Sequence, residues 1–197
     1  MRLLLALAVS AALAPLGAWA ECPTATDLEK GIVFKSDVKY AELFRILPSG
    51  MIQTINSANG KATSRTLIAK GVYLLELIDL ENNKPIPSTR TTYAFPGAPA
   101  DLPDPKPNAK FELTVAVWDR GDIRKEQQIY AGGALNSVTI GACTYDMFPI
   151  NVTYIDGYNT DKHLLHYLPA LKVAYLAATT YDNSTDTYNY FSIEVAK

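Results

Sequence analysis

Hydrophobic and polar residues alternate along most of the chain with a repeat of two. In residues 111–117, Phe, Leu and Val at the odd positions alternate with Glu, Thr and Ala. Successive side chains of a strand point to opposite faces, so this pattern predicts a strand with one buried face. Asn59-Gly60 and Asp156-Gly157 each separate two such segments, and these residue pairs are typical of tight hairpin turns.

Strand-like segments separated by turn residues cover the chain from residue 31 onward. They predict about twelve antiparallel strands. The segments are Gly31–Ser36, Tyr40–Leu47, Met51–Ser57, Lys61–Ala69, Val72–Leu80, Ser88–Phe95, Phe111–Val117, Ile123–Tyr130, Leu135–Cys143, Tyr145–Ile155, Tyr158–Leu168, Leu171–Tyr181 and Thr187–Val195. One short helix is predicted before them at residues 24–30, with a threonine cap and Gly31 as its end. We therefore expect an all-β, antiparallel fold.

A proline-rich segment divides the predicted strands into two halves. Residues 96–108 contain five of the twelve prolines, and proline cannot donate the hydrogen bond that a helix or a central strand needs. We predict a crossover within a single domain, with a functional lid as the alternative. Lys70–Leu75 and Lys172–Ala177 resemble each other, which leaves open whether the two halves arose by duplication or match by chance.

The first twenty residues have the plan of a secretory signal peptide. A positive start, Met1-Arg2, precedes an apolar stretch at residues 3–16, and Ala18-Trp19-Ala20 follows as a cleavage site. The apolar stretch is shorter than the ~20 residues that a membrane-spanning helix needs, although a retained anchor is the alternative. We predict cleavage between Ala20 and Glu21, and a mature chain of residues 21–197 that is exported to the periplasm and soluble, without a transmembrane segment.

Export changes the interpretation of the two cysteines. In an oxidising compartment Cys22 and Cys143 are expected to form a disulfide bond, with free thiols or metal ligation as the alternatives.

The charge balance of the chain disfavours one class of partner, nucleic acid. The chain has 18 Lys and Arg against 20 Asp and Glu, a net charge of −2, which leaves no basic surplus for nucleic-acid binding.

Candidate catalytic chemistry depends on the only two histidines, His163 and His166. Their spacing would place both on one face of a helix, but their apolar neighbours favour a strand, where they point to opposite sides. A shared metal ion with Asp161 is therefore disfavoured, and no cofactor is expected. Glu76 lies within an apolar run and points either into the core or, by alternation, towards solvent.

Tyrosine is the one residue type in excess. The chain has twelve, and nine of them lie from Tyr130 onward. Rigid amphipathic rings on a sheet form binding surfaces for carbohydrates, peptides or lipid head groups, but tyrosine is also an ordinary strand former. The residues that we assign to a possible ligand surface are Tyr154, Tyr158, Tyr188 and Tyr190.

Three stretches of the chain carry a family resemblance. They are Cys22-Pro23-Thr24-Ala25 with Asp27-Leu28 and Gly31-Ile32, then Ile140-Gly141-Ala142-Cys143-Thr144-Tyr145, and Tyr167-Leu168-Pro169. With them the mature chain resembles a group of uncharacterised exported proteins of alphaproteobacteria. More distantly, its order of strands resembles periplasmic half-barrels typified by lipoprotein carriers. The resemblance implies a curved antiparallel sheet or half-barrel with an apolar concave face, and it implies no catalytic residues.

Three functions remain possible from the sequence. The first is a non-enzymatic periplasmic binding or envelope-associated protein, which uses a concave apolar face or the tyrosine-rich strands for an apolar small molecule or lipid. The second is a hydrolase or metal-dependent enzyme that uses His163 or His166. The third is a structural partner of another envelope protein, which an exposed edge strand or apolar patch would indicate. We favour the first.

Overall fold

The computed structural model describes residues 21–36, 39–157, 160–182 and 184–197. The predicted signal peptide and Tyr158 therefore lie outside the described residues. Strands and short 3-10 helices make up the regular structure. In chain order these are η1 (Ala25–Glu29), β1 (Ile32–Lys35), β2 (Tyr40–Ile46), β3 (Ile52–Ala58), β4 (Lys61–Ala69), β5 (Tyr73–Glu81), β6 (Lys84–Pro85), η2 (Pro87–Thr89), β7 (Thr91–Ala94), η3 (Pro99–Asp101), β8 (Lys110–Asp119), β9 (Asp122–Gly132), β10 (Asn136–Ile140), β11 (Cys143–Ile155), β12 (Thr160–Leu168), β13 (Val173–Tyr181), β14 (Ser184–Thr187) and β15 (Ser192–Val195).

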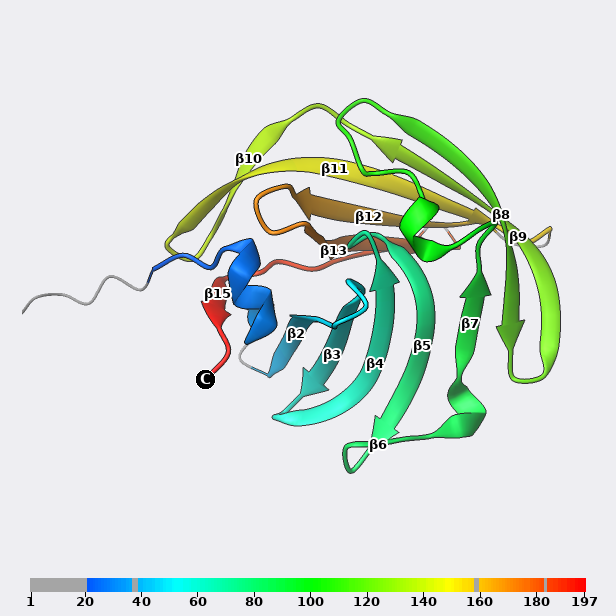
Figure 1. The fold of residues 1–197 in the computed structure, drawn as a ribbon, viewed down its shortest axis with the longest axis horizontal. Coiled ribbons are helices and arrows are strands. Elements are labelled where there is room, and N and C mark those ends of the chain that lie inside the picture. Colours follow the sequence, from blue (N-terminus) through cyan, green and yellow to red (C-terminus); the bar gives the residue numbers. More distant parts are fainter. Residues whose placement is uncertain (1–20, 37–38, 158–159, 183) are drawn as a thin grey trace, which may run out of the picture.

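All fifteen strands belong to one antiparallel sheet (Figure 1). Its order is β14-β13-β12-β11-β9-β8-β7-β5-β4-β3-β2-β1-β15, with β10 paired to β11 and β6 paired to β5. Most neighbours in this order are also neighbours along the chain, as expected where tight turns join antiparallel strands. The prediction of an all-β, antiparallel fold is confirmed, and none of the described residues forms an α-helix. None of the helices formed by those residues is long and apolar enough to cross a membrane.

The structure corrects two details of the predicted sheet. The described residues form fifteen strands and not about twelve, partly because residues 187–195 contribute to two strands, β14 and β15, where one was expected. The sheet is neither closed nor strongly curled, so the expected half-barrel is not observed. Side chains fill the space between the two halves of the sheet, so the apolar face that the resemblance implied is covered by the protein itself.

Two clusters of buried side chains join the first strands to the last ones. In the first cluster Phe34 of β1 contacts Tyr175 of β13, with ring centroids 5.7 Å apart. In the second, Tyr73 of β5 contacts Tyr130 of β9, with centroids 4.8 Å apart. β13 is buried on both faces, because residues 173–175 and 177–179 are all buried. Strands far apart in the sequence therefore share one interior.

Residues 184–195 connect the two ends of the sheet. β14 pairs with β13, the Tyr188 amide donates to the Ala177 carbonyl oxygen at 2.8 Å, and β15 pairs with β1. Between them the Phe191 amide donates to the Lys35 carbonyl oxygen at 2.9 Å. One continuous segment thus pairs first with β13 and then with β1, and these two strands do not pair with each other.

The predicted disulfide bond joins Cys22 to Cys143, with Cα atoms 5.5 Å apart. It fastens the chain in front of η1 to the start of β11. Nearby, the Tyr145 hydroxyl donates a hydrogen bond of 3.0 Å to the Pro23 carbonyl oxygen. The disulfide and this hydrogen bond hold η1 over the first cluster, where Leu28 is 2 % exposed. The short helix expected at residues 24–30 is therefore present, as a 3-10 helix.

The two segments that resemble each other meet in space. Gly71, in the β4–β5 turn, accepts a hydrogen bond of 2.9 Å from the Ala174 amide, just after the β12–β13 turn. A Cβ atom on Gly71 would lie 2.2 Å from the Lys172 carbonyl oxygen, so only glycine permits this approach. Lys70 and Lys172 share a positive φ, of 52° and 57°. The contact brings the two turns together at one end of the sheet.

Candidate functional site

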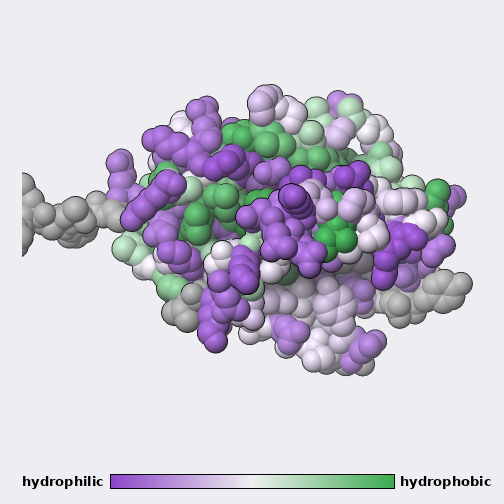
Figure 2. Space-filling view, turned by 90° about the horizontal axis from the view of Figure 1, so that it is seen from below, coloured by the Kyte–Doolittle hydropathy of each residue, from purple (hydrophilic) through white to green (hydrophobic). Residues whose placement is uncertain are grey.

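A groove of about 1050 Å³ lies at the end of the sheet where these two turns meet. Its walls are formed by η1, the β2–β3 turn, and the proline-rich crossover with η3, while the β4–β5 and β12–β13 turns complete the lining. Seen from below, the surface carries hydrophobic patches that are bordered by hydrophilic residues (Figure 2). The groove is at the upper end of the volume range of small-molecule sites, which are usually ~300–1,000 Å³.

Apart from Gly71, the buried lining residues of the groove are apolar or aromatic, and we refer to them as its floor. They are Leu28, Ile52, Ala69, Phe148 and Tyr167. The rings of Phe148 and Tyr167 contact each other with centroids 5.1 Å apart. These two positions face each other in the β11–β12 pairing, so the strand register itself places the aromatic pair there. A floor of this kind favours the apolar part of a ligand.

Charged side chains occur among the lining residues of the groove. The Lys70 ammonium lies 2.9 Å from a carboxylate oxygen of Asp104, which belongs to the crossover. A hydrogen bond from Lys70, together with its charge, lowers the pKa of the Asp104 carboxyl. Lys172 and Glu29 also line the groove. Within the described part of the chain, neither of them has an ion-pair partner within 4.0 Å.

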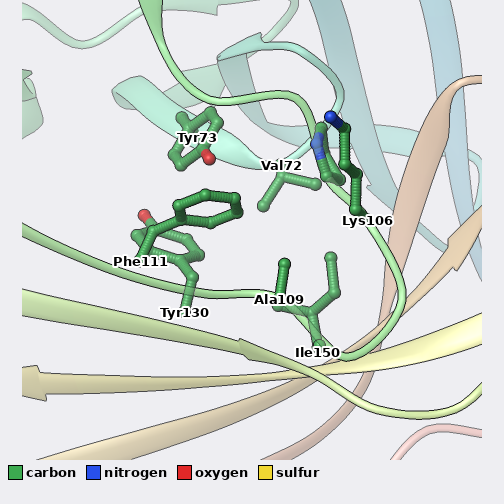
Figure 3. Close-up of a pocket in the computed structure, with 9 residues that line it drawn as sticks. Val72, Tyr73, Lys106, Ala109, Phe111, Tyr130 and Ile150 are labelled. Atoms are coloured by element: carbon green, nitrogen blue, oxygen red, sulfur yellow. The ribbon is translucent and has the colours of Figure 1, made fainter.

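The crossover is held in place by contacts with the sheet. The Tyr73 hydroxyl donates a 2.8 Å hydrogen bond to the Pro103 carbonyl oxygen, and the Asn108 amide donates a 3.0 Å hydrogen bond to the Gly133 carbonyl oxygen. Beneath the crossover is a cavity of about 10 Å³, towards which Val72 and the Phe111 ring point (Figure 3). A volume of this size holds about one water molecule. The cavity is therefore too small for a ligand, and the groove is the candidate site.

The two histidines of β12 have different neighbours. The His163 Nε2 lies 2.9 Å from the Tyr181 hydroxyl, and its ring contacts Tyr154. The His166 Nδ1 lies 2.9 Å from the Tyr175 hydroxyl. Burial lowers the pKa of both rings. Among the described residues, no group of three or more His, Cys, Asp or Glu side chains is arranged to hold a metal ion. Neither histidine lines the groove.

The described tyrosines of the predicted ligand surface lie in separate contacts. Tyr154 faces His163, with centroids 4.8 Å apart, whereas Tyr190 packs on Phe34 and Tyr175. Tyr188 is 36 % exposed, and its hydroxyl lies 3.3 Å from the Thr179 hydroxyl. Tyr188 and Tyr190 lie in the segment between β14 and β15 and not in a strand. None of these three lines the groove.

Glu76 takes neither of the two extreme positions considered for it. Its carboxylate lies 3.0 Å from the Arg65 guanidinium and 3.6 Å from that of Arg90, and its side chain is 21 % exposed. Arg65 comes from the neighbouring strand β4 and Arg90 from the segment before β7. The side chain is thus partly buried in a salt-bridge network, which explains how a carboxylate fits within an apolar run.

Two polar networks were not predicted, one buried on β9 and one partly buried on β2. On β9, Tyr130 donates a 2.6 Å hydrogen bond to the Gln128 Oε1, and the Gln128 Nε2 donates a 2.7 Å hydrogen bond to Glu126. On β2, the Glu42 carboxyl bonds to the hydroxyls of Thr54 and Tyr190, and burial raises its pKa to about 7. Alternation along β2 places Glu42 on the same face as the buried Phe44, which is the signal that could have identified it.

Comparison with protein-family models, curated proteins and solved structures finds no match to this chain. The groove must therefore be interpreted from its own chemistry. It combines an apolar, partly aromatic floor with lysine and carboxylate side chains in the lining. This combination is suited to binding a molecule with an apolar part and at least one polar group.

Proposed function

We propose that this protein is a non-enzymatic binding protein that holds a small, largely apolar molecule in the groove beside the proline-rich crossover. The observation that carries the proposal is the size of the groove, about 1050 Å³, together with the apolar residues of its floor. Burial of apolar ligand surface contributes ~25 cal/mol per Å², so such a floor provides most of the binding free energy.

Binding without catalysis agrees with the residues that form the groove. The only histidines lie elsewhere, and each is close to a tyrosine hydroxyl. Aliphatic side chains, proline and alanine dominate the lining, and these groups do not transfer protons or attack bonds. The crossover supplies Ala98, Pro99, Ala100, Asp104, Pro105 and Pro107 to one wall. We therefore interpret the crossover as part of the binding site as well as a connection between the two halves.

We propose that the protein works outside the cytoplasm, in the periplasm. The disulfide bond between Cys22 and Cys143 supports this location, because such bonds persist in oxidising compartments and are rare in the cytosol. The signal-peptide pattern of residues 1–20 supports it independently. A binding protein in the periplasm carries or buffers apolar molecules that have low solubility in water.

Titration with Nile red, an uncharged apolar dye that fluoresces in apolar sites, tests the proposed function. Ala100 lies in the crossover wall of the groove, so A100W is expected to weaken dye binding by about tenfold or more by filling the site. A142W is the matched control, because Ala142 is exposed in the β10–β11 turn and does not line the groove. Absence of saturable binding to the wild type, or equal loss in both variants, would refute the proposal.

A further inference from the structure

We infer that the groove selects an amphiphile with one acyl chain and a terminal anionic oxygen group, and that Lys172 and Lys70 bind this head group. The inference rests on the proposed function and adds the chemical class of the ligand. A carboxylate and a phosphate share the chemistry in question, since both present charged oxygen atoms to an ammonium group.

The fold brings the two lysines to the same part of the groove. Lys70 precedes Gly71 in the β4–β5 turn, and Lys172 closes the β12–β13 turn. These turns touch, because Gly71 accepts the hydrogen bond from Ala174 and leaves no room for a Cβ atom beside the Lys172 carbonyl oxygen. Both lysines line the groove. The two lysines thus come from different hairpins and line one groove only in the folded protein.

The contacts that Lys70 and Lys172 make in the folded protein leave both ammonium groups available to bind an anion. Lys70 is paired with Asp104, whose side chain is 68 % exposed, and an exposed ion pair contributes only ~0–1 kcal/mol. A ligand anion can therefore replace Asp104 at little cost. Lys172 has no ion-pair partner within 4.0 Å in the described chain. An anionic head group would give this ammonium the counter-charge that it lacks.

The floor determines the rest of the ligand. Ala69, which precedes Lys70, belongs to the same buried cluster as Phe148 and Tyr167, whereas Leu28 and Ile52 belong to the other cluster. A single acyl chain can cover this apolar floor while its head group stays at the lysines. A sugar or a peptide would instead leave polar groups against apolar side chains, which costs binding free energy.

Displacement of Nile red by three ligands with the same chain tests this inference. The ligands are tridecanoate, dodecyl phosphate and dodecanol, which carry the same alkyl chain and differ only in the head group. The two anions are expected to bind the wild-type protein about tenfold more tightly than the alcohol, because a charge-assisted contact is lost in the alcohol. This preference should decrease as salt is added. Any difference between the two anions would identify which oxygen group the site prefers.

Three variants separate the head-group contact from general effects. K172Q is expected to reduce anion affinity by about tenfold and to leave dodecanol binding unchanged. D104N is expected to strengthen anion binding several-fold, because it removes the carboxylate that competes for Lys70. K61Q is the control for net charge, since Lys61 is exposed at the start of β4 and does not line the groove.

The outcomes distinguish this inference from the proposed function. Equal affinities for the anions and the alcohol would overturn the head-group inference while leaving the binding function intact. The same loss of anion affinity in K61Q as in K172Q would also overturn it, because the effect would come from net charge alone. Failure of Nile red and all three ligands to bind would refute the proposed function itself.

Discussion

Replacement of Glu42 by glutamine is expected to change how the stability of the protein depends on pH. The Glu42 side chain lies on the same face of β2 as the buried Phe44, and its carboxyl bonds to the hydroxyls of Thr54 and Tyr190. Thr54 is fully buried, and its hydroxyl lies 2.7 Å from that of Thr66. Burial raises the pKa of Glu42 to about 7, because a carboxylate there loses most of its hydration.

The sign and size of the effect follow from this pKa. The unfolded chain releases the Glu42 proton near pH 4.5, whereas the folded protein keeps it to about pH 7. Between these values the folded state binds more protons, so the free energy of unfolding falls as the pH rises. The shift corresponds to a loss on the order of 3 kcal/mol, complete above pH ~7. E42Q has no proton to release, so at pH ~8 it should be more stable than the wild type by up to about 3 kcal/mol.

Urea denaturation at several pH values measures this difference. The free energy of unfolding is compared for the wild type, E42Q and the control E81Q, with far-UV circular dichroism as the signal. Glu81 lies exposed at the end of β5, so E81Q should follow the wild-type profile. E42Q should gain relative to the wild type between pH ~5 and ~8. A constant difference between E42Q and the wild type across this range would refute the reasoning.

Two further predictions concern covalent and steric constraints. Replacement of Cys22 and Cys143 by serine should lower the free energy of unfolding by about 5 kcal/mol in the chain-entropy model, because the disulfide closes a loop with a sequence separation of 121; urea titration with and without reductant measures this. G71A should destabilise the protein by more than about 2 kcal/mol, because its Cβ would collide with the Lys172 carbonyl oxygen. G60A has a similar φ of 73° but open space around it, so its cost should stay near ~1 kcal/mol, and equal thermal shifts for the two variants would contradict the steric argument.

Local sequence patterns were sufficient to predict most strands and turns. The alternation at residues 111–117 predicted β8, in which Val115 and Val117 are fully buried. At the first predicted hairpin, Asn59 and Gly60 both have positive φ, of 52° and 73°, as tight hairpin turns require. The proline-rich segment contains no strand between β7 and β8. Each of these features depends on residues that are close together in the sequence.

Features that depend on distant residues could not be predicted in this way. Alternation continues through Tyr188 and Tyr190, so the local pattern does not reveal that the chain leaves β13 and joins β1. The groove requires η1, three turns and the crossover to meet, and no local pattern encodes their meeting. The nearest signal was the similarity between Lys70–Leu75 and Lys172–Ala177, which marks the two turns that touch at Gly71.

The pairing of β1 with β15 has a consequence for how the protein folds. Ile32 lies opposite Val195, so the whole segment from residue 32 to residue 195 must be available before this pair of strands can form. Contacts between such distant residues slow folding, because a long loop must close before any hydrogen bond compensates for it. Until then β1 has one unpaired, apolar edge that can pair with another molecule. We therefore expect β15 to protect the folding protein against aggregation, and its removal to reduce the yield of monomer more strongly than it reduces ligand affinity.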